Sequence, residues 1–167
     1  MLKIINDLSV FIEDCYRRIN VREYARIMGI SAPTASKLLV YYSKEGLLKK
    51  GNYRNYILFY ANKNSRDFID LSRIYWRHIL NRLTESMEKK LVNPTIILFG
   101  SLSKAESKKN SDIDIAVFAE KKEIDISDFE KKLKRKIEIF WFASLNDVKS
   151  KELLNNIKNG YVLAGRL

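Results

Sequence analysis

The sequence is poor in cysteine, proline and glycine. Its single cysteine, Cys15, excludes an intramolecular disulfide and a metal site built from several cysteines. No apolar run approaches the roughly 20 residues that cross a bilayer, so we expect no membrane partner. Only two prolines and six glycines interrupt 167 residues, of which 46% are hydrophobic and 31% charged. This composition is typical of a globular protein with one domain or two small ones.

The beginning of the sequence lacks the features of an export signal. The stretch MLKIINDLSVFIEDC carries Asp7 within its apolar part and has no small-residue cleavage site. We therefore expect a cytoplasmic protein. The only histidine, His78, falls among the core positions of an expected helix, and we assign it no role.

Negative charge is scarce relative to positive charge. The chain has 31 Lys and Arg against 20 Asp and Glu, which gives a formal net charge of +11. Such an excess favours polyanionic partners, either nucleic acid or nucleotide phosphates. A solvated, lysine-rich surface would give the same balance, so charge alone does not decide between these interpretations.

The first part of the chain has the pattern of three helices. Apolar residues at helical spacing predict one helix over about 2–15 and a second, short one over Val21–Met28. Gly29 can adopt the left-handed conformation that ends the second helix. Ser31 is placed to cap a third helix, which ends near Gly46.

A basic hairpin follows these helices. The β-rich runs Leu47-Leu48 and Tyr56–Tyr60 flank a polar turn at Lys49-Lys50-Gly51-Asn52. Two short helices joined by a tight glycine turn, with such a hairpin after them, resemble the winged helix-turn-helix DNA-binding domain. The resemblance covers residues 1–62.

This resemblance implies that the third helix enters the major groove of duplex DNA while the hairpin contacts the backbone. Small polar residues on that helix and flanking cations would suit this placement. The residues that would face DNA are Arg22, Arg26, Ser31, Thr34, Ser36, Lys37, Lys49, Lys50 and Arg54. Winged helices also serve as protein-interaction and dimerisation modules, and this alternative stays open.

A long helix is expected to connect the two halves of the chain, within residues 63–93. Its apolar residues recur at spacings of three and four, which predicts one amphipathic helix. Asn64 or Ser65 would begin this helix, and Pro94 would close it. Its core positions are Trp76, Leu80, Leu83, Met87 and Leu91.

The C-terminal part, residues 94–167, alternates strands with helical segments. TIILF, at 95–99, is short and continuously apolar, as expected for a strand buried on both faces. A helical turn over 102–107 and a polar loop lead to a second strand over about 112–119. KIEIFWF supplies a third strand. This order predicts an α/β or α+β fold with a small mixed sheet.

Capping signals predict two helices in the same part of the chain. Ser127 with Glu130 has the pattern of a capping box and would begin a helix that runs to about Lys134. Ser144 with Asp147 would begin a last helix that runs to about Asn159.

Two aspartates stand one residue apart at the start of the second strand. Because residues i and i+2 of a strand point to the same face, Asp112 and Asp114 would project together. Two carboxylates a few ångströms apart repel each other unless a cation lies between them. Mg²⁺ takes oxygen ligands and often uses only one or two carboxylates, which leaves places for substrate phosphates. Upstream, Gly100 permits close backbone approach, and Ser101 opens a helical turn whose N–H groups suit a phosphate.

This arrangement resembles the nucleotidyltransferase superfamily of DNA polymerase beta, most closely its minimal branch. The family signature is a strand, Gly-Ser, about ten residues, and then Asp-hydrophobic-Asp-hydrophobic. Here Gly100-Ser101 is followed by ten residues and then by Asp112-Ile113-Asp114-Ile115. The resemblance covers about residues 90–167. It implies transfer of a nucleoside monophosphate, AMP from ATP, to a hydroxyl group, with pyrophosphate leaving.

The resemblance also implies roles for individual residues. Asp112 and Asp114 would ligate Mg²⁺ or Mn²⁺, and a third acid, Glu138, would complete a catalytic and metal-binding site. The residues that would hold the triphosphate are Gly100, Ser101, Lys104 and Ser111. Glu138 could instead be an edge-strand residue that pairs with Lys136 or faces water.

Two positions depart from the family pattern: the third acid, Glu138, is a Glu where Asp is commoner, and Ala105 stands where glycine is usual. Relatives often continue Gly-Ser-x-Ala-Arg-Gly-Glu, whereas here Lys104 keeps the positive charge and Ala105 replaces the usual glycine. This difference leaves open a transcriptional regulator whose nucleotidyltransferase-like domain only binds or senses nucleotide. Modification of a small molecule, such as an antibiotic, is a third alternative.

The partners follow from the same resemblance. Residues 94–167 are too few to include the extra substrate-binding domain of larger relatives, so the acceptor pocket would come from the winged domain, a second subunit or a partner protein. By analogy, minimal nucleotidyltransferases often act as antitoxins that attach AMP to a partner toxin, and a DNA-binding domain would suit autoregulation. We therefore expect an NTP, duplex DNA and a partner toxin as partners, with a homodimer as an alternative.

Overall fold

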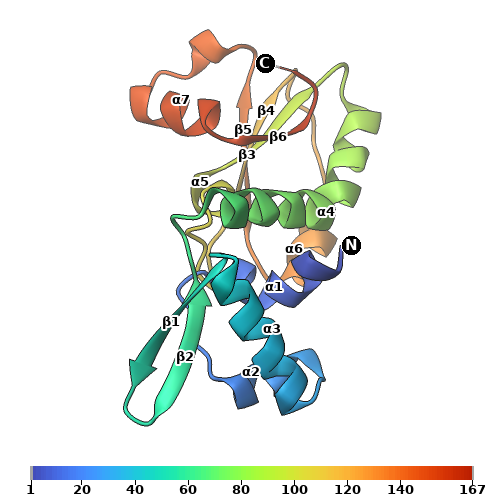
Figure 1. Ribbon diagram of the computed structural model, residues 1–167. Coiled ribbons are helices and arrows are strands. Elements are labelled where there is room, and N and C mark those ends of the chain that lie inside the picture. Colours follow the sequence, from blue (N-terminus) through green and yellow to red (C-terminus); the bar gives the residue numbers. More distant parts are fainter. Residues whose placement is uncertain (1, 167) are drawn as a thin grey trace. The chain divides into compact units, whose positions relative to one another are not determined.

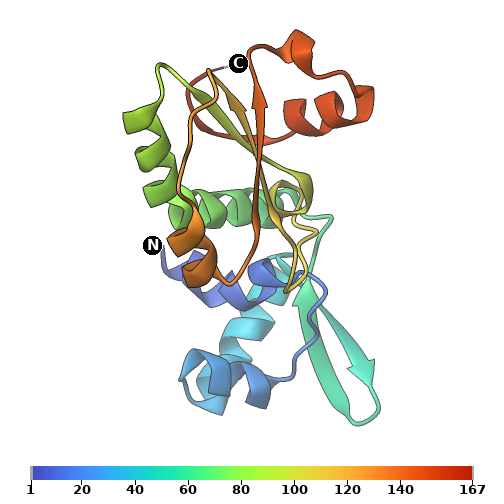
Figure 2. The same ribbon diagram turned by 180° about the vertical axis from the view of Figure 1, so that it is seen from behind.

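The computed structural model describes residues 2–166 and divides the chain into two compact units (Figures 1 and 2). Unit 1 contains the residues up to 72 together with the short segment 105–109. Unit 2 contains residues 73–104 and the chain from 110 onward. Within residues 2–166, the structure has no helix that is both long and apolar enough to span a bilayer.

Unit 1 consists mainly of three helices and a two-stranded antiparallel hairpin, in the order expected from the sequence. Their bounds are α1 Lys3–Glu13, α2 Val21–Met28, α3 Ala32–Lys44, β1 Leu48–Tyr53 and β2 Tyr56–Ala61. Gly29 ends α2 with φ of 65°, and the Ser31 side chain accepts a hydrogen bond from the Thr34 N–H, as predicted. Asn20 adds a cap for α2, because its side chain accepts from the Glu23 N–H.

The core of unit 1 joins the three helices. Leu8, Phe11 and Leu39 are fully buried, and Phe11 stacks on Tyr24 with ring centroids 5.9 Å apart. Asp7 is also buried. Its cost of burial is offset because it accepts a 2.7 Å hydrogen bond from the Tyr42 hydroxyl and pairs with Lys3. The first helix is shorter than predicted, since it ends at Glu13, before Cys15.

The long helix α4 spans Arg66–Lys90. Ser65 begins it, because the Ser65 hydroxyl accepts a hydrogen bond from the Phe68 N–H at 3.3 Å. The predicted core positions Trp76, Leu80 and Leu83 are all buried. Residues 66–72 of α4 belong to unit 1, and residues 73–90 belong to unit 2.

Unit 2 is built on a mixed four-stranded sheet in the order β5-β4-β3-β6. The strands are β3 Thr95–Phe99, β4 Ile113–Phe118, β5 Ile137–Phe142 and β6 Tyr161–Ala164. β5 is one of the two edge strands, visible as the orange arrow in Figure 2, and it runs parallel to β4. β3 is antiparallel to both of its neighbours, β4 and β6. Every residue of β3 is buried, as its continuous apolar run predicted.

The two faces of this sheet carry different sets of buried side chains. Ile97, Phe99 and Ala116 lie on one face and pack with Val148 and Ile157. Ile157 belongs to α7 Lys151–Lys158, so this helix covers part of that face (Figure 1). The opposite face carries the fully buried side chains Ile96, Leu98, Ile113 and Val117. An aspartate at position 114 therefore falls on the face that α7 partly covers.

Both predicted capping boxes need correction. Helix α6 spans Ser127–Leu133, but it has no side-chain cap from Ser127, whose N–H and hydroxyl both donate to Asp125. Glu130 instead accepts a 2.8 Å hydrogen bond from the Ile137 N–H, so it fixes the start of β5. The capping box of Ser144 and Asp147 does form, but it caps only a single 3-10 turn, η1 Leu145–Asp147.

Two other boundaries differ from the prediction, and one strand was not predicted. The helical turn α5 spans Gly100–Ser103, two residues earlier than expected. Ser150, rather than Ser144, begins the last helix, since its side chain accepts from the Leu153 N–H. Strand β6 was not predicted. It is too short for periodicity to reveal, and it is formed because its residues pair with Ile97 and Leu98 of β3.

Candidate functional site

Three strands of unit 2 bring two acidic residues together at one end of the sheet. Phe99, the last residue of β3, pairs with Asp114 of β4, and Asp114 pairs in turn with Glu138 of β5. Paired residues on neighbouring strands point to the same face, so the two carboxyl side chains lie side by side. Asp112 stands just before β4 and is exposed, rather than within the strand as predicted.

Gly100 is fitted closely to Asp114. Its φ of 71° lies in the left-handed region, which costs a residue with a side chain about 1–2 kcal/mol. A Cβ at this position would lie 3.2 Å from Asp114 Cγ and closer still to its Oδ2 atom. Glycine is therefore required for two reasons at the turn between β3 and α5.

The Asp114 carboxyl group is difficult to ionise in this environment. Its pKa is raised to about 6, mainly by burial and in addition by the negative charges of Glu138 and Asp112. Such a shift is expected where carboxylates gather without a compensating cation. The site therefore holds negative charge that a metal ion would neutralise.

Glu138 has a cationic partner of its own. Its carboxylate forms an ion pair with Lys136, as one interpretation of the sequence anticipated. Both side chains are accessible to water, and the ion pair raises the pKa of Lys136. The Lys136 carbonyl also accepts a 2.9 Å hydrogen bond from the Ile113 N–H, which holds the start of β5 against β4. Glu138 thus takes part in an ion pair while it lies beside Asp114.

The remaining predicted residues of this site lie in the segment that joins β3 to β4. Ser101 is half-buried in the first turn of α5. The Lys104 ammonium donates a 2.7 Å hydrogen bond to Asn156 of α7. The Ser111 carbonyl accepts a 2.6 Å hydrogen bond from Arg135.

Sequence reasoning did not identify Arg135 and Asn156 as neighbours of the site. Arg135 stands in a lysine-rich run and Asn156 on the polar side of a helix, so neither position carries a distinguishing pattern. Both contacts depend on how β5 and α7 pack against the segment between β3 and β4. Only the tertiary structure could reveal them.

Ala105 adopts the backbone conformation that a glycine would adopt. Its φ of 54° is left-handed, and its side chain is fully buried. The family pattern has glycine here because that residue reaches this conformation without strain. Alanine at this position therefore carries the strain of a left-handed backbone conformation.

The carboxyl groups of Asp112, Asp114 and Glu138, called the acidic cluster below, suit a hard divalent cation. The donors of this cluster are carboxylate oxygens, and the pKa of Asp114 is raised by burial and by the charges of Glu138 and Asp112. Within residues 2–166, the structure contains no ready-made group of three or more acidic, His or Cys side chains that could hold a metal ion. Mg²⁺ commonly binds through one or two carboxylates and completes its shell with water and phosphate, so this donor set is sufficient for it.

In unit 1, the residues predicted to face DNA lie on the surface. All of them are exposed except Ser36, which is half-buried: Arg22, Arg26, Ser31, Thr34, Ser36, Lys37, Lys49, Lys50 and Arg54. The Ser31 and Thr34 hydroxyls share a 2.8 Å hydrogen bond at the start of α3. Arg54 turns the hairpin with φ of 51° and lies over the Tyr53 ring. The hairpin thus exposes a cation and an aromatic ring together.

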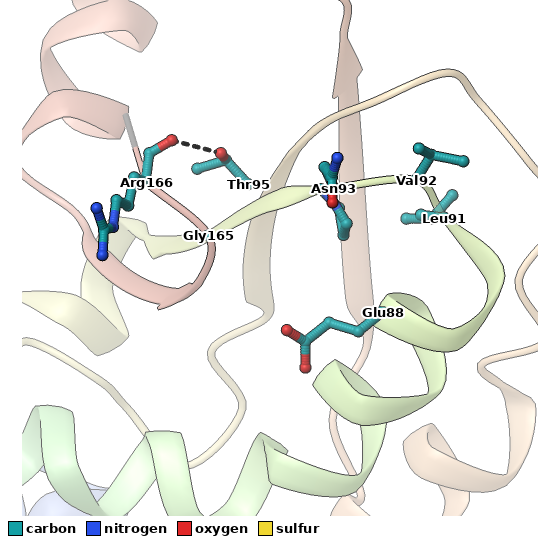
Figure 3. A pocket seen from close by; sticks show the side chains of 8 residues that line it. Glu88, Leu91, Val92, Asn93, Thr95, Gly165 and Arg166 are labelled. Atoms are coloured by element: carbon teal, nitrogen blue, oxygen red, sulfur yellow. Dashed lines mark hydrogen bonds between the residues drawn. The ribbon is translucent and has the colours of Figure 1, made fainter.

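A pocket of about 620 Å³ lies at the opposite end of the sheet from the acidic cluster (Figure 3). It is lined by Glu88 from α4 and by Thr95 and Arg166. The Thr95 hydroxyl donates a 2.6 Å hydrogen bond to the Arg166 carbonyl across its wall. Thr95 pairs with Phe118 at the far end of β4, so this pocket does not include Asp114.

Comparison with known proteins points to one family. The family model described as "Polymerase beta, Nucleotidyltransferase" matches residues 81–166, about half of the chain. The matched region contains β3, α5, β4 and β5, and with them every residue of the acidic cluster. No curated protein matches the chain.

Proposed function

This chain belongs to the polymerase beta nucleotidyltransferase family, and on that premise we propose that unit 2 transfers a nucleoside monophosphate to a hydroxyl group. The donor is an NTP, ATP by preference, and the modified group is AMP. The acceptor oxygen forms a bond to the α-phosphorus, the bond from that phosphorus to the bridging oxygen breaks, and pyrophosphate leaves with the electron pair. The acceptor proton passes to a carboxylate or to water.

The observation that best supports this proposal is the position of Asp114. Its carboxylate lies against Gly100 at the end of β3 and beside Glu138 on β5. The Gly-Ser turn and the acids therefore occupy one end of the sheet. A triphosphate held at the turn would meet the carboxylates there.

In this proposal the residues of the site have different roles. Asp112 and Asp114 hold Mg²⁺ or Mn²⁺, which when bound neutralises charge on the triphosphate and favours in-line displacement. Ser101 and Lys104 hold phosphate oxygens, with Lys104 oriented by its hydrogen bond to Asn156. Glu138 accepts or relays the proton of the acceptor hydroxyl.

Gly100 and Ser111 serve this site through the backbone. Gly100 allows the chain to pass close to the Asp114 carboxylate, where a side chain would collide. The Ser111 carbonyl binds Arg135 and so fixes the residue that precedes Asp112. These contacts hold the turn and the acids in one arrangement before substrate binds.

The acceptor in this proposal is a hydroxyl of a partner protein, with a toxin as the specific candidate. In this proposal a partner protein or a second copy of the chain supplies part of the pocket. The toxin candidate rests on family analogy and not on a contact in this chain.

The direct test is to incubate the full chain with each α-³²P-labelled NTP, Mg²⁺ and proteins co-purified from its native host. Transfer of label to a protein, lost in both Asp112→Ala and Asp114→Ala, is the expected result. Metal-dependent NTP binding should disappear in the same variants. Unchanged binding in both variants would contradict the site, whereas binding without transfer would favour a nucleotide-sensing regulator.

Unit 1 carries a second candidate function, which is binding of duplex DNA. We propose that α3 enters the major groove and that the β1–β2 hairpin contacts phosphates. The supporting observation is that the predicted contact residues are exposed on α2, α3 and the hairpin, with cations in each element. A DNA-binding unit joined to a transferase would allow the protein to regulate its own gene.

A further inference from the structure

Unit 1 contains a pocket of which only one lining residue, Lys49, is assigned to a candidate function, the binding of duplex DNA. Its volume is about 340 Å³, and it opens beside the base of the hairpin, where Lys49 of β1 pairs with Tyr60 of β2. The other walls come from the segment after α1, with Tyr16 and Arg18, and from Lys63 after β2. All of these residues belong to unit 1.

Two of the cations are held over aromatic rings. The Lys63 ammonium lies 3.7 Å from the centroid of the Tyr16 ring, and the Arg18 guanidinium lies 4.9 Å from that of Tyr60. A cation over a ring face is attracted by the negative charge of that face. These contacts hold the ammonium and guanidinium groups at the pocket.

Positive charge dominates around the pocket. Three of the residues that line it, Arg18, Lys49 and Lys63, are cations, and the lining residues include no carboxylate. Lys108 adds a fourth cation, since its ammonium lies 5.5 Å from the Tyr16 ring. Asp14 precedes Tyr16 by two residues, and its side chain accepts a hydrogen bond from the Tyr16 N–H at 3.2 Å. The lining itself has three cations and no carboxylate.

The combination of cations and aromatic rings selects a class of ligand. An isolated inorganic anion would need the cations alone, and an apolar ligand would need the rings alone. A nucleotide uses both, because its phosphate pairs with Lys and Arg while its base stacks on an aromatic face. The volume is also within the range of pockets that take small ligands.

We propose that this pocket binds a nucleotide phosphate together with its base. Arg18 and Lys63 contact the phosphate, and Tyr16 or Tyr60 contacts the base. The nucleotide is either a free mononucleotide or one unit of a single-stranded nucleic acid, since both present the same chemistry. The proposal does not depend on transfer activity, because the acidic cluster belongs to unit 2.

The test measures binding of ADP and of an eight-residue oligothymidylate to the full chain by calorimetry. EDTA is present throughout, so that the metal-dependent site of unit 2 does not contribute. The test variant is Arg18→Gln/Lys63→Gln, which removes two charges and keeps similar side-chain lengths. The matched control is Lys44→Gln/Arg77→Gln, which removes the same charges from exposed residues outside the pocket.

The expected result is binding of at least one probe that weakens on the order of tenfold or more in the test variant, because each cation gives a charge-assisted hydrogen bond. In the control variant, the affinity for the probe should change by less than about twofold. ADP binding identifies a free nucleotide as the ligand, and binding of the oligonucleotide alone identifies single-stranded nucleic acid.

Three outcomes would overturn the proposal: no binding of either probe, equal weakening in the test and control variants, or binding of inorganic pyrophosphate as tight as that of ADP. The last result would show that the rings do not contribute. If the double variant does not fold, the single variants Arg18→Gln and Lys63→Gln provide the same comparison, and Tyr16→Ala, at an exposed ring, tests stacking separately.

Discussion

The Asp114 carboxylate packs against the α-carbon of Gly100, at the point where β3 turns into α5. Replacement of Gly100 by alanine should therefore destabilise unit 2 in two ways. The left-handed backbone costs about 1–2 kcal/mol for alanine, and the collision with Asp114 adds about 1–3 kcal/mol. Chemical denaturation of Gly100→Ala and wild type measures the sum.

Gly29 provides a matched control for this prediction. Its φ of 65° is similar to that of Gly100, but a Cβ there would meet nothing within 4 Å. Gly29→Ala should therefore show the backbone cost alone. Removal of the carboxylate in Gly100→Ala/Asp114→Ala should recover part of the loss. Equal losses at both glycines, with no recovery in the double variant, would show that the contact with Asp114 is unimportant.

The raised pKa of Asp114 predicts how stability depends on pH without metal. In the folded protein this pKa is about 6, above the ordinary value of 3.8, so the folded state binds more protons between these two pH values. Stability should consequently fall as pH rises from about 4 to 6 and change little from this cause above pH 6. We expect titration of Asp114 to lower the free energy of unfolding by about 1–2 kcal/mol over this range, a value reduced because the side chain is partly exposed.

Other acids also titrate in this range, so the measurement is a difference between two proteins. In EDTA, wild type and Asp114→Asn are unfolded by denaturant at several pH values from 4 to 8. The variant should gain stability relative to wild type as pH rises, and Mg²⁺ should stabilise only the wild type. A constant difference across this range would contradict the assigned environment of Asp114.

The sequence predicted part of the arrangement of the candidate site. The spacing of Gly100 and Asp114 predicted a turn beside an acid on a strand, and the structure has Asp114 next to Gly100, whereas Asp112 lies before β4 and not within it. Glu138 could be proposed only from the family, since its pairing with Asp114 depends on β5 lying parallel to β4. No sequence pattern pointed to Asn156, because its contact with Lys104 joins positions 52 residues apart.

The errors at helix starts have a common physical origin. Ser127 and Glu130 match a capping box, but Asp125 and the start of β5 offer competing hydrogen bonds, and those form instead. A local sequence pattern indicates which hydrogen bonds the chain can form. The tertiary structure decides which of them are made.

The segment 105–109 is fixed within unit 1 by Ser107. Its hydroxyl donates a 2.6 Å hydrogen bond to the Ile12 carbonyl near the end of α1, and this bond is buried. Ser107→Ala should destabilise unit 1 by about 1–3 kcal/mol, because the carbonyl keeps only the weak Cys15 thiol donor at 3.6 Å. Thermal and denaturant unfolding of the variant give the value.

Ser9→Ala is the matched control for Ser107→Ala. The Ser9 hydroxyl also donates to a backbone carbonyl, that of Asn6 at 2.7 Å, but this bond is exposed to water. Its removal should change stability by less than about 0.5 kcal/mol. Similar effects of the two substitutions would show that the buried bond of Ser107 contributes nothing particular.

Binding of duplex DNA by unit 1 should depend steeply on salt. Each phosphate contact contributes about −0.9 to the slope of log affinity against log salt concentration. Lys49 and Lys50 are exposed on β1, so Lys49→Ala and Lys50→Ala should each flatten the slope by about one contact without changing sequence preference. Fluorescence anisotropy at several salt concentrations provides both quantities. Absence of binding at low salt would favour a protein-interaction role.

Glu138 is the residue whose role most needs a decisive experiment, because it lies beside Asp114 and also pairs with Lys136. If it activates the acceptor hydroxyl, Glu138→Gln should leave NTP affinity within about threefold and lower transfer by about 10²–10⁴-fold. If the ion pair is what matters, Lys136→Gln should cause the same loss, since it breaks the pair from the other side. We expect Lys136→Gln to retain most of the transfer activity. Equal losses in the two variants, measured with labelled NTP and a fixed acceptor, would assign Glu138 a structural role.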